Sequence, residues 1–120
     1  MAEAASHRQL IVWQKAMDTA VAVYEASNRF PRAETYGLTS QLRRAAASVP
    51  ANIAEGSARS TAKDSSNFLS IAKGSLMETE TFLMLAVRLG YLTETDAGSA
   101  FRLITEVSKM PTAMRSKLAS

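Results

Sequence analysis

A series of hydrogen-bonding side chains recurs at steps of three and four residues between positions 41 and 59. Its members are Gln41, Arg44, Ser48, Asn52, Glu55 and Arg59. Because residues three and four apart share one face of an α-helix, this spacing predicts a continuous polar row. One interpretation of the row is an ordinary solvated helix face. The other is a surface for subunit contact or for a polar ligand, because it lacks the usual Glu and Lys pairs and small alanines flank it.

Basic side chains in and near this row are the candidates for contact with phosphate. Arg43 and Arg44 are adjacent, although successive helical residues point about 100° apart. Two solvated arginines suffice for an isolated chain, but closed symmetry in an oligomer would repeat each arginine once per subunit. We expect salt-sensitive nucleic-acid binding through these residues: Arg43, Arg44, Arg59, Lys63 and Lys73. The candidates for subunit contact are Gln41, Ser48, Asn52 and Glu55.

Residues suited to catalysis are scarce. His7 is the only histidine, and we expect it to be solvated near the N-terminus. Glu78 and Glu80 are two residues apart and point in different directions on a helix, so they do not form a carboxylate pair. No Glu-x-x-His motif, Gly-rich phosphate loop or nucleophile elbow is present. The sequence therefore predicts no catalytic residue, no cofactor and no metal site, and hence a protein that is not an enzyme.

Length and composition indicate one helical domain. The chain has 120 residues, of which 47% are hydrophobic and 7% aromatic, and alanine, leucine and methionine favour helices. There is no cysteine, no apolar run of about 18 residues and no signal-peptide pattern, so we expect a cytoplasmic protein without a membrane span. The net charge of +3 permits a nucleic-acid partner without requiring one.

Four apolar patterns predict helices at about 9–28, 38–58, 62–89 and 94–117. The first is marked by an apolar face formed by Leu10, Trp13, Met17, Val21 and Tyr24. Thr61 is the expected N-cap of the third helix, and either Thr93 or Thr95 caps the fourth. Gly90 is a natural residue to end the third helix. Short connections between amphipathic helices predict an all-α, antiparallel up-down-up-down four-helix bundle.

Pro50 lies inside the second of these patterns. The apolar spacing keeps its phase from Val49 to Ile53, which favours one helix kinked at Pro50 over a loop between two helices. The loop remains the alternative. In the third helix, Gly74 and Ser75 predict close helix packing. The methionines on the helical seams are expected to fill the core: Met77, Met84, Met110 and Met114.

Four stretches resemble the bacterial four-helix-bundle family of 23S rRNA intervening-sequence proteins. They are LIVWQKAMD, FPRAETYGLTSQLRRAAASVPANIAEGSAR, FLSIAKGSLMETETFL and RLGYL. The resemblance covers about Leu10 to Leu92 continuously and the fourth helix more loosely. The middle block is its most specific part, with matches at Gln41, Arg43, Arg44, Ser48, Pro50, Asn52, Ile53, Ala54, Glu55 and Gly56. Lys73 stands where the family more often has arginine, which keeps the charge but loses the forked donor.

The resemblance implies an antiparallel bundle that assembles as a ring-shaped homopentamer. The chain is also similar to the accessory protein of diversity-generating retroelements, a basic pentameric barrel that binds reverse transcriptase and nucleic acid. The implied partners are further copies of the chain, RNA or DNA, and a protein such as a reverse transcriptase. We therefore expect a non-enzymatic, oligomeric nucleic-acid-binding or adaptor protein. The alternative is a protein-interaction scaffold that does not touch nucleic acid and whose arginines pair between subunits.

Overall fold

The computed structural model describes residues 7–110, and in this range the chain is entirely helical apart from its connections. The elements are η1 (His7–Gln9), α1 (Ile11–Ser27), η2 (Arg32–Glu34), α2 (Leu38–Ser57), α3 (Ala62–Arg88) and α4 (Glu94–Ser108). This confirms the all-α fold and the four-helix bundle. None of these helices is long and apolar enough to cross a membrane.

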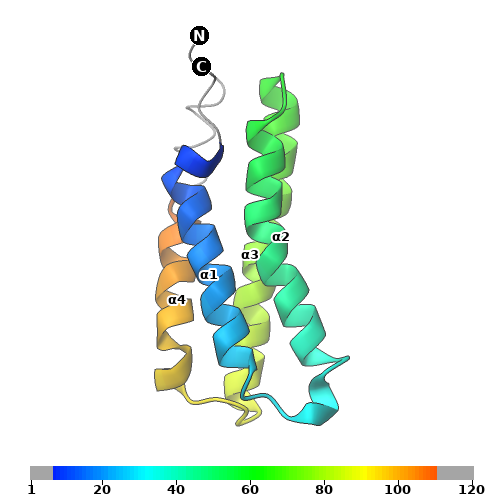
Figure 1. Cartoon of the computed structure of the whole chain (residues 1–120), viewed down its shortest axis with the longest axis vertical. Coiled ribbons are helices and arrows are strands. Elements are labelled where there is room, and N and C mark those ends of the chain that lie inside the picture. Colours follow the sequence, from blue (N-terminus) through cyan, green and yellow to red (C-terminus); the bar gives the residue numbers. More distant parts are fainter. Residues whose placement is uncertain (1–6, 111–120) are drawn as a thin grey trace.

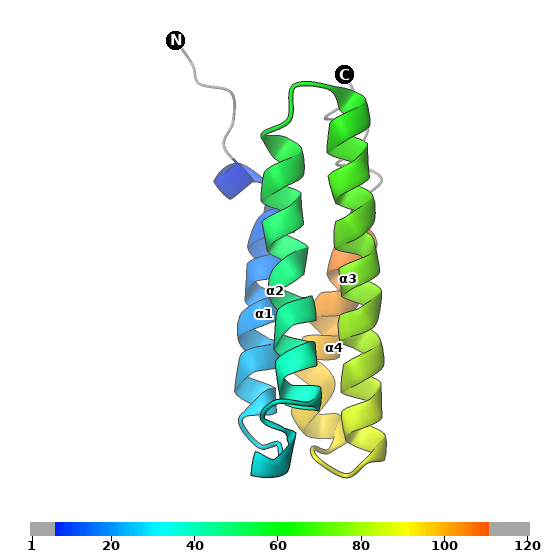
Figure 2. The same ribbon diagram turned by 90° about the vertical axis from the view of Figure 1, so that its right-hand side faces the viewer.

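The four helices alternate in direction, as the colour gradient in Figure 1 shows. Figure 2 shows α1 and α3 on opposite sides, with α2 in front of them and α4 behind. Helices α2 and α3 share the most extensive contact, and their connecting turn extends beyond the beginning of α1 and the end of α4 (Figure 1). The α2–α3 hairpin is therefore the long axis around which the two shorter helices pack.

The helix ends follow the capping signals in the sequence. The hydroxyl of Thr61 accepts the N–H of Asp64 at 3.1 Å, which confirms Thr61 as an N-cap. Of the two alternatives for α4, Thr93 is the cap, because its hydroxyl accepts the N–H of Asp96 at 3.0 Å. Gly90 has a φ of +80° and follows α3 directly, as expected for a residue that ends a helix. The predicted extension of the fourth helix to 117 lies beyond the described residues.

Pro50 lies inside a continuous α2 and is buried. This confirms the single helix and excludes the loop between two helices. Val49 and Ile53 are both buried, so the apolar face does keep its phase across the proline. The bend at Pro50 stays a prediction.

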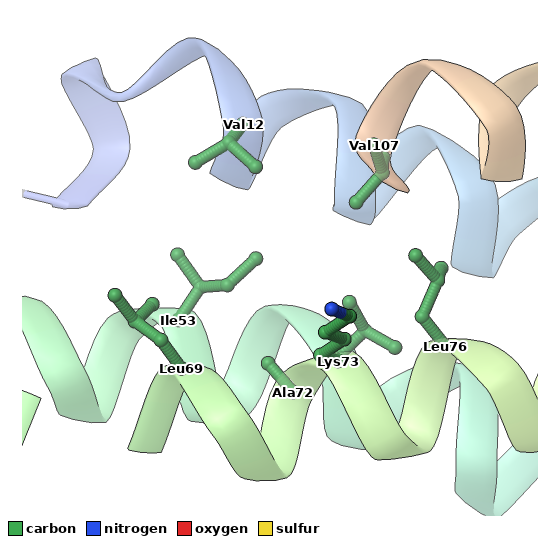
Figure 3. A pocket seen from close by; sticks show the side chains of 8 residues that line it. Val12, Ile53, Leu69, Ala72, Lys73, Leu76 and Val107 are labelled. Atoms are coloured by element: carbon green, nitrogen blue, oxygen red, sulfur yellow. The ribbon is translucent and has the colours of Figure 1, made fainter. Parts of the chain in front are cut away.

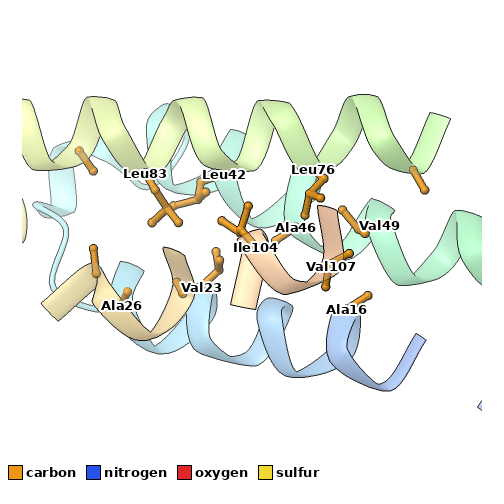
Figure 4. Packing of buried hydrophobic residues seen from close by; sticks show 14 of the residues in the cluster. Ala16, Val23, Ala26, Leu42, Ala46, Val49, Leu76, Leu83, Ile104 and Val107 are labelled. Atoms are coloured by element: carbon orange, nitrogen blue, oxygen red, sulfur yellow. The ribbon is translucent and has the colours of Figure 1, made fainter. Parts of the chain in front are cut away.

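The core fills the space between all four helices. Figure 4 shows Leu42 and Ala46 of α2, Leu76 and Leu83 of α3, and Ile104 of α4 meeting in its centre. The leucines are 0–1% exposed and Ile104 is 1% exposed. Every side-chain N or O atom that is buried among the described residues has a hydrogen-bond partner. The bundle is therefore closed around an apolar centre without polar defects.

The apolar face that marks α1 in the sequence is not the face that α1 buries. Met17, Val21 and Tyr24 are 40%, 56% and 43% exposed, and only Leu10 and Trp13 pack partly against the core. The buried side chains are smaller: Val12, Ala16, Thr19, Val23 and Ala26. Small residues occupy the buried face of α1 because they let the helix approach its neighbours closely. The larger apolar residues therefore face outward.

Three predictions for α3 are wrong because the residues concerned lie on its exposed side. Met77 and Met84 do not fill the core but are 39% and 55% exposed. Gly74 lies on the outer surface, where an added Cβ would meet nothing within 4 Å, so it does not serve helix packing inside the chain. The close approach occurs instead at Gly56, whose added Cβ would lie 3.2 Å from the carbonyl oxygen of Ser65.

The beginning of α1 is anchored by an aromatic pair. The ring of His7 stands edge-on to Trp13, with 4.9 Å between ring centroids. His7 is half-buried in η1 rather than fully solvated as expected. This contact ties η1 to the first turn of α1.

Candidate functional site

The centre of the polar row is used inside the chain. The hydroxyl of Ser48 forms a 2.8 Å hydrogen bond with that of Ser75 on α3. The side-chain amide of Asn52 donates to the carbonyl and to the hydroxyl of Ser48, at 2.8 and 2.9 Å. Ser48 and Asn52 are half-buried and Ser75 is buried. These residues form a polar clasp between α2 and α3, and a role for Ser48 and Asn52 in subunit contact stays a prediction.

A shallow polar groove opens beside this clasp. It has a volume of about 250 Å³ and lies between α2 and α3. Its lining residues are Gln41, Arg44, Ala45, Ser48, Ser75, Glu78 and Phe82. Gln41, Arg44 and Glu78 are exposed, so the groove offers an amide, a guanidinium and a carboxylate to solvent. The structure thus places Gln41 and Arg44 together, as the row predicts, and adds Glu78, which the sequence did not indicate as a binding residue.

The other end of the row lies at the α2–α3 turn. Arg59 donates to the carboxylate of Glu55 at 2.6 Å, and its guanidinium lies 4.5 Å from the ring centroid of Phe68. Both charged side chains remain about half exposed. An exposed ion pair contributes little to stability, but the aromatic ring holds the arginine in a defined place at the surface.

Arg43 is held by the end of α1 instead of pointing freely into solvent. Its Nε donates to the hydroxyl of Ser27 at 2.7 Å, and a terminal nitrogen donates to the Asn28 side chain at 3.0 Å. The guanidinium also lies 4.8 Å from the ring centroid of Tyr24 and donates weakly to its carbonyl at 3.4 Å. A cation that donates to the last turn of a helix satisfies groups that the helix itself leaves unpaired. Phosphate contact by Arg43 stays a prediction.

The two predicted lysines lie on α3. Lys63 is exposed in the first turn, and Lys73 is exposed almost three turns further along. The side chain of Lys73 also lines a small cavity of about 10 Å³ whose other walls are apolar, among them Val12, Leu69 and Leu76 (Figure 3). A cavity of this size and polarity is too small for a ligand and is best described as a packing gap.

The two halves of the bundle differ in charge. The α2–α3 turn, the beginning of α1 and the end of α4 lie toward the same end (Figure 1). Residues 7–16, 49–75 and 103–110, which form this half, carry six basic and three acidic side chains, a net charge of +3. Residues 17–48 and 76–102 carry six basic and seven acidic side chains, a net charge of −1. The folded chain therefore has a cationic half, although basic and acidic side chains are spread evenly along the sequence: seven and five in residues 1–60, seven and six in residues 61–120.

A second polar connection lies at the opposite end and was not predicted. One carboxylate oxygen of Glu34 accepts the N–H of Leu38 at 3.0 Å, and the other accepts the hydroxyl of Tyr91 at 2.7 Å. These two bonds lower the pKa of Glu34 below its ordinary value, and the bond to Glu34 raises the pKa of Tyr91. Glu34 thus joins the start of α2 to the α3–α4 connection. Its position four residues before Leu38, near a helix start, was the available signal.

Helices α1 and α4 are joined by an ion pair. Lys15 and Glu106 are 2.7 Å apart, and each side chain is 37% exposed. The hydrogen bond and the charge of the partner raise the pKa of Lys15 and lower that of Glu106. This pair removes one cation of the cationic half from contact with a ligand.

The helix order, the polar clasp and the cationic half around the α2–α3 turn define a small all-helical bundle that carries polar and charged side chains along α2. The sequence profile of the 23S rRNA-intervening sequence protein family matches residues 8–113, and the chain belongs to this family. No curated protein matches the sequence. A crystal structure of a protein with unknown function from the S23 ribosomal protein family of Bacteroides thetaiotaomicron is similar to this fold. It has a TM-score of 0.77 and 27% sequence identity, over 88% of this chain and 98% of that chain.

Proposed function

We propose that this chain is a cytoplasmic, non-enzymatic, oligomeric protein that binds nucleic acid and acts as an adaptor, with the pentamer that its family resemblance implies. The observation that carries the proposal is the cationic half of the bundle around the α2–α3 turn. A polyanion is attracted to such a half through release of its counterions, and oligomer symmetry would multiply the effect. The proposal also includes the similarity of this chain to the accessory protein of diversity-generating retroelements.

Three cations of this half are the proposed phosphate contacts: Arg59, Lys63 and Lys73. Arg59 rests on Phe68 and is bound to Glu55 on one edge, so its remaining N–H groups stay available to an acceptor. Lys63 and Lys73 form no salt bridge among the described residues, and neither needs to leave an intrachain partner to bind phosphate. Arg44 extends the proposed contact along the polar groove.

The test compares two double variants of equal charge. Lys63→Glu with Lys73→Glu changes the cationic half, and Arg32→Glu with Arg102→Glu makes the same change in the opposite half. Fluorescence anisotropy with a labelled structured RNA and a labelled DNA duplex, each at several salt concentrations, measures binding. We expect the first variant to lose most binding and to reduce the salt slope for duplex DNA by about 2, since each contact contributes about 0.9. Equal losses in both variants, or no binding of the unmodified chain at low salt, would contradict the proposal.

The second candidate is a protein-interaction scaffold without direct nucleic-acid contact. It is favoured by the groove at Gln41, Arg44 and Glu78, which offers both signs of charge to a protein surface. In this case Arg44 pairs between subunits or with a partner such as a reverse transcriptase. Replacing Arg43 and Arg44 by alanine and measuring mass by light scattering separates the two. Dissociation favours the scaffold, whereas an intact oligomer that no longer binds nucleic acid favours the first proposal.

A further inference from the structure

The polar groove beside the clasp carries two opposite charges that do not pair. Arg44 of α2 and Glu78 of α3 both line it, and both side chains are exposed. Neither takes part in the salt bridges found among residues 7–110, which join other side chains. A guanidinium and a carboxylate that share a groove without pairing leave room for a polar group between them.

The hydrogen bond between Ser48 and Ser75 sets the order of side chains along the groove. Helices α2 and α3 lie side by side and run in opposite directions (Figure 2), so a step back along α2 corresponds to a step forward along α3. Arg44, about one turn before Ser48, is therefore level with Glu78, about one turn after Ser75. Phe82 follows one turn beyond Glu78. The groove thus has a pair of hydroxyls at one end, the two charges in the middle and an aromatic ring at the other end.

The inner wall of the groove consists of small side chains whose polar groups already have partners. Ala45 and Ser75 are buried, and Ser48 and Ser75 bond to each other. The volume of about 250 Å³ is below the range of about 300–1,000 Å³ that is usual for pockets that enclose a whole drug-sized ligand. The groove therefore suits one ring of a larger chain that continues outside it. Phe82, which is half-buried, supplies a surface on which such a ring can stack.

The two charges favour a nucleobase over a phosphate group. A phosphate would be attracted by Arg44 and repelled by Glu78 at the same level. A nucleobase is neutral, and its edges offer hydrogen-bond donors to the carboxylate and acceptors to the guanidinium. Single-stranded nucleic acids are recognised in this manner, through bases that turn outward, stack on aromatic side chains and form hydrogen bonds at their edges.

We propose that Arg44, Glu78 and Phe82 form a base slot for an unpaired guanine of a single-stranded nucleic acid. Guanine has two neighbouring donors, N1–H and N2–H, which one carboxylate can accept together, and two neighbouring acceptors, O6 and N7, which match the fork of an arginine. Adenine would turn its amino group toward the guanidinium, uracil would turn carbonyl groups toward the carboxylate, and cytosine has only one amino group for it. This inference rests on the proposed function and names the group that the groove receives.

The location of the base slot fits a strand that is held by the cationic half. Arg44 and Arg59 belong to the same polar row, and the 15 steps between them correspond to about 22 Å of helix. Single-strand-binding domains cover about 4–16 nucleotides, so one strand has the length to contact both residues. Its phosphates would lie on the cationic half, and one base further along the strand would enter the slot.

Short RNAs with one variable base test the proposal. Fluorescence anisotropy at a fixed low salt concentration measures the binding of labelled UUUXUUU, where X is guanine, adenine, cytosine, uracil or inosine. The unmodified chain should bind the guanine strand about 5- to 150-fold more tightly than the adenine, cytosine and uracil strands, the range for one good bidentate contact to a base. Inosine lacks the N2 amino group of guanine, so its strand should bind with intermediate affinity.

Four variants separate base contacts from general attraction. Glu78→Gln should abolish the preference for guanine and bind the uracil strand at least as well as before, because a negative charge is lost. Glu25→Gln removes the same charge from the exposed face of α1 and should keep the preference. Arg44→Lys keeps the charge but loses the fork, so the preference should disappear. Phe82→Leu should weaken all strands alike, since stacking does not depend on the identity of the base. Circular dichroism checks that each variant keeps its helices.

The outcomes distinguish this inference from the proposed function. Equal binding of all five strands, or a guanine preference that survives Glu78→Gln, would overturn the base slot and leave nucleic-acid binding standing. No binding of any strand, of structured RNA or of duplex DNA would remove both proposals. Light scattering covers the scaffold alternative: a lower oligomer mass in Glu78→Gln than in Glu25→Gln would assign the groove to protein contact and overturn the base slot.

Discussion

Two glycines inside helices should respond to alanine in opposite directions. Alanine is favoured over glycine in a helix interior by about 0.8–1 kcal/mol. Gly74 has open space at the place of a Cβ, so Gly74→Ala should gain about that amount of stability. At Gly56 the new Cβ would lie 3.2 Å from the Ser65 carbonyl oxygen and 3.3 Å from the Cβ of Phe68, closer than ordinary contact.

The backbone of α3 cannot easily move away from Gly56. The hydroxyl of Ser65 donates to the carbonyl of Gly56 at 2.7 Å and holds the two helices together. Overpacking of this kind costs about 1–3 kcal/mol. The helix preference offsets only part of the cost, because Gly56 is next to the last residue of α2. We expect Gly56→Ala to destabilise the chain by about 0.5–2 kcal/mol, so that the two variants differ by about 2 kcal/mol.

Urea unfolding followed by circular dichroism measures both changes. The comparison is made at several protein concentrations, because Gly74 lies on the outer surface of α3 and a change in assembly would make the apparent stability depend on concentration. A Gly56→Ala variant as stable as Gly74→Ala would refute the close approach of α2 and α3. A Gly74→Ala variant that loses stability at every concentration would refute the open position of Gly74.

Three further predictions concern single contacts. Arg43→Lys should lower the free energy of unfolding by about 1–2 kcal/mol, because lysine cannot reproduce the forked bonds to the end of α1, whereas the exposed Arg44→Lys should stay within about 0.5 kcal/mol. Equal urea midpoints for the two variants would contradict a stabilising role of the bonds between Arg43 and the end of α1. Because the pKa of Glu34 is lowered in the folded chain, ionised Glu34 stabilises the fold above the ordinary carboxyl pKa. At pH 7 the unmodified protein should therefore be more stable than Glu34→Gln, and this difference should shrink as the pH falls from the ordinary carboxyl pKa to the lowered one. A difference independent of pH would contradict this. Thr93→Ala should cost about 1 kcal/mol and Thr95→Ala almost nothing, as thermal unfolding can show, and the reverse order would place the cap at Thr95.

The course of the chain could be predicted because local signals agree with one another. The periodic apolar residues gave all four helices, and the caps at Thr61 and Thr93 and the turn at Gly90 set their ends. Continuity through Pro50 followed from the unbroken phase of Val49 and Ile53. These features depend on residues close together in the sequence, where spacing alone carries the information.

The orientation of α1 could not be predicted in the same way. This helix has two apolar faces, and the larger residues, such as Met17 and Tyr24, give the stronger pattern. Which face is buried depends on how closely the other helices approach, and Ala16 and Ala26 fit where larger side chains would not. Periodicity detects an apolar face but does not say whether the chain itself or another molecule covers it.

The sequence predicted which residues belong to the candidate site but not which contacts they make. The spacing places Gln41 and Arg44 on one surface, and the structure agrees. The partner of Ser48 is Ser75, 27 residues away, and this pairing depends on the register between α2 and α3. The same holds for the bonds of Arg43 to the end of α1, because only folding brings those residues together.

The aromatic pair at the beginning of α1 has a practical consequence. Trp13 is the single tryptophan of the chain, so all indole emission comes from one turn of one helix. The nearby imidazole of His7 makes that emission sensitive to whether the first turn is docked. Fluorescence and ellipticity recorded during the same melt therefore compare one corner of the molecule with the whole, and coincident curves would mean that this corner opens only when the entire bundle does.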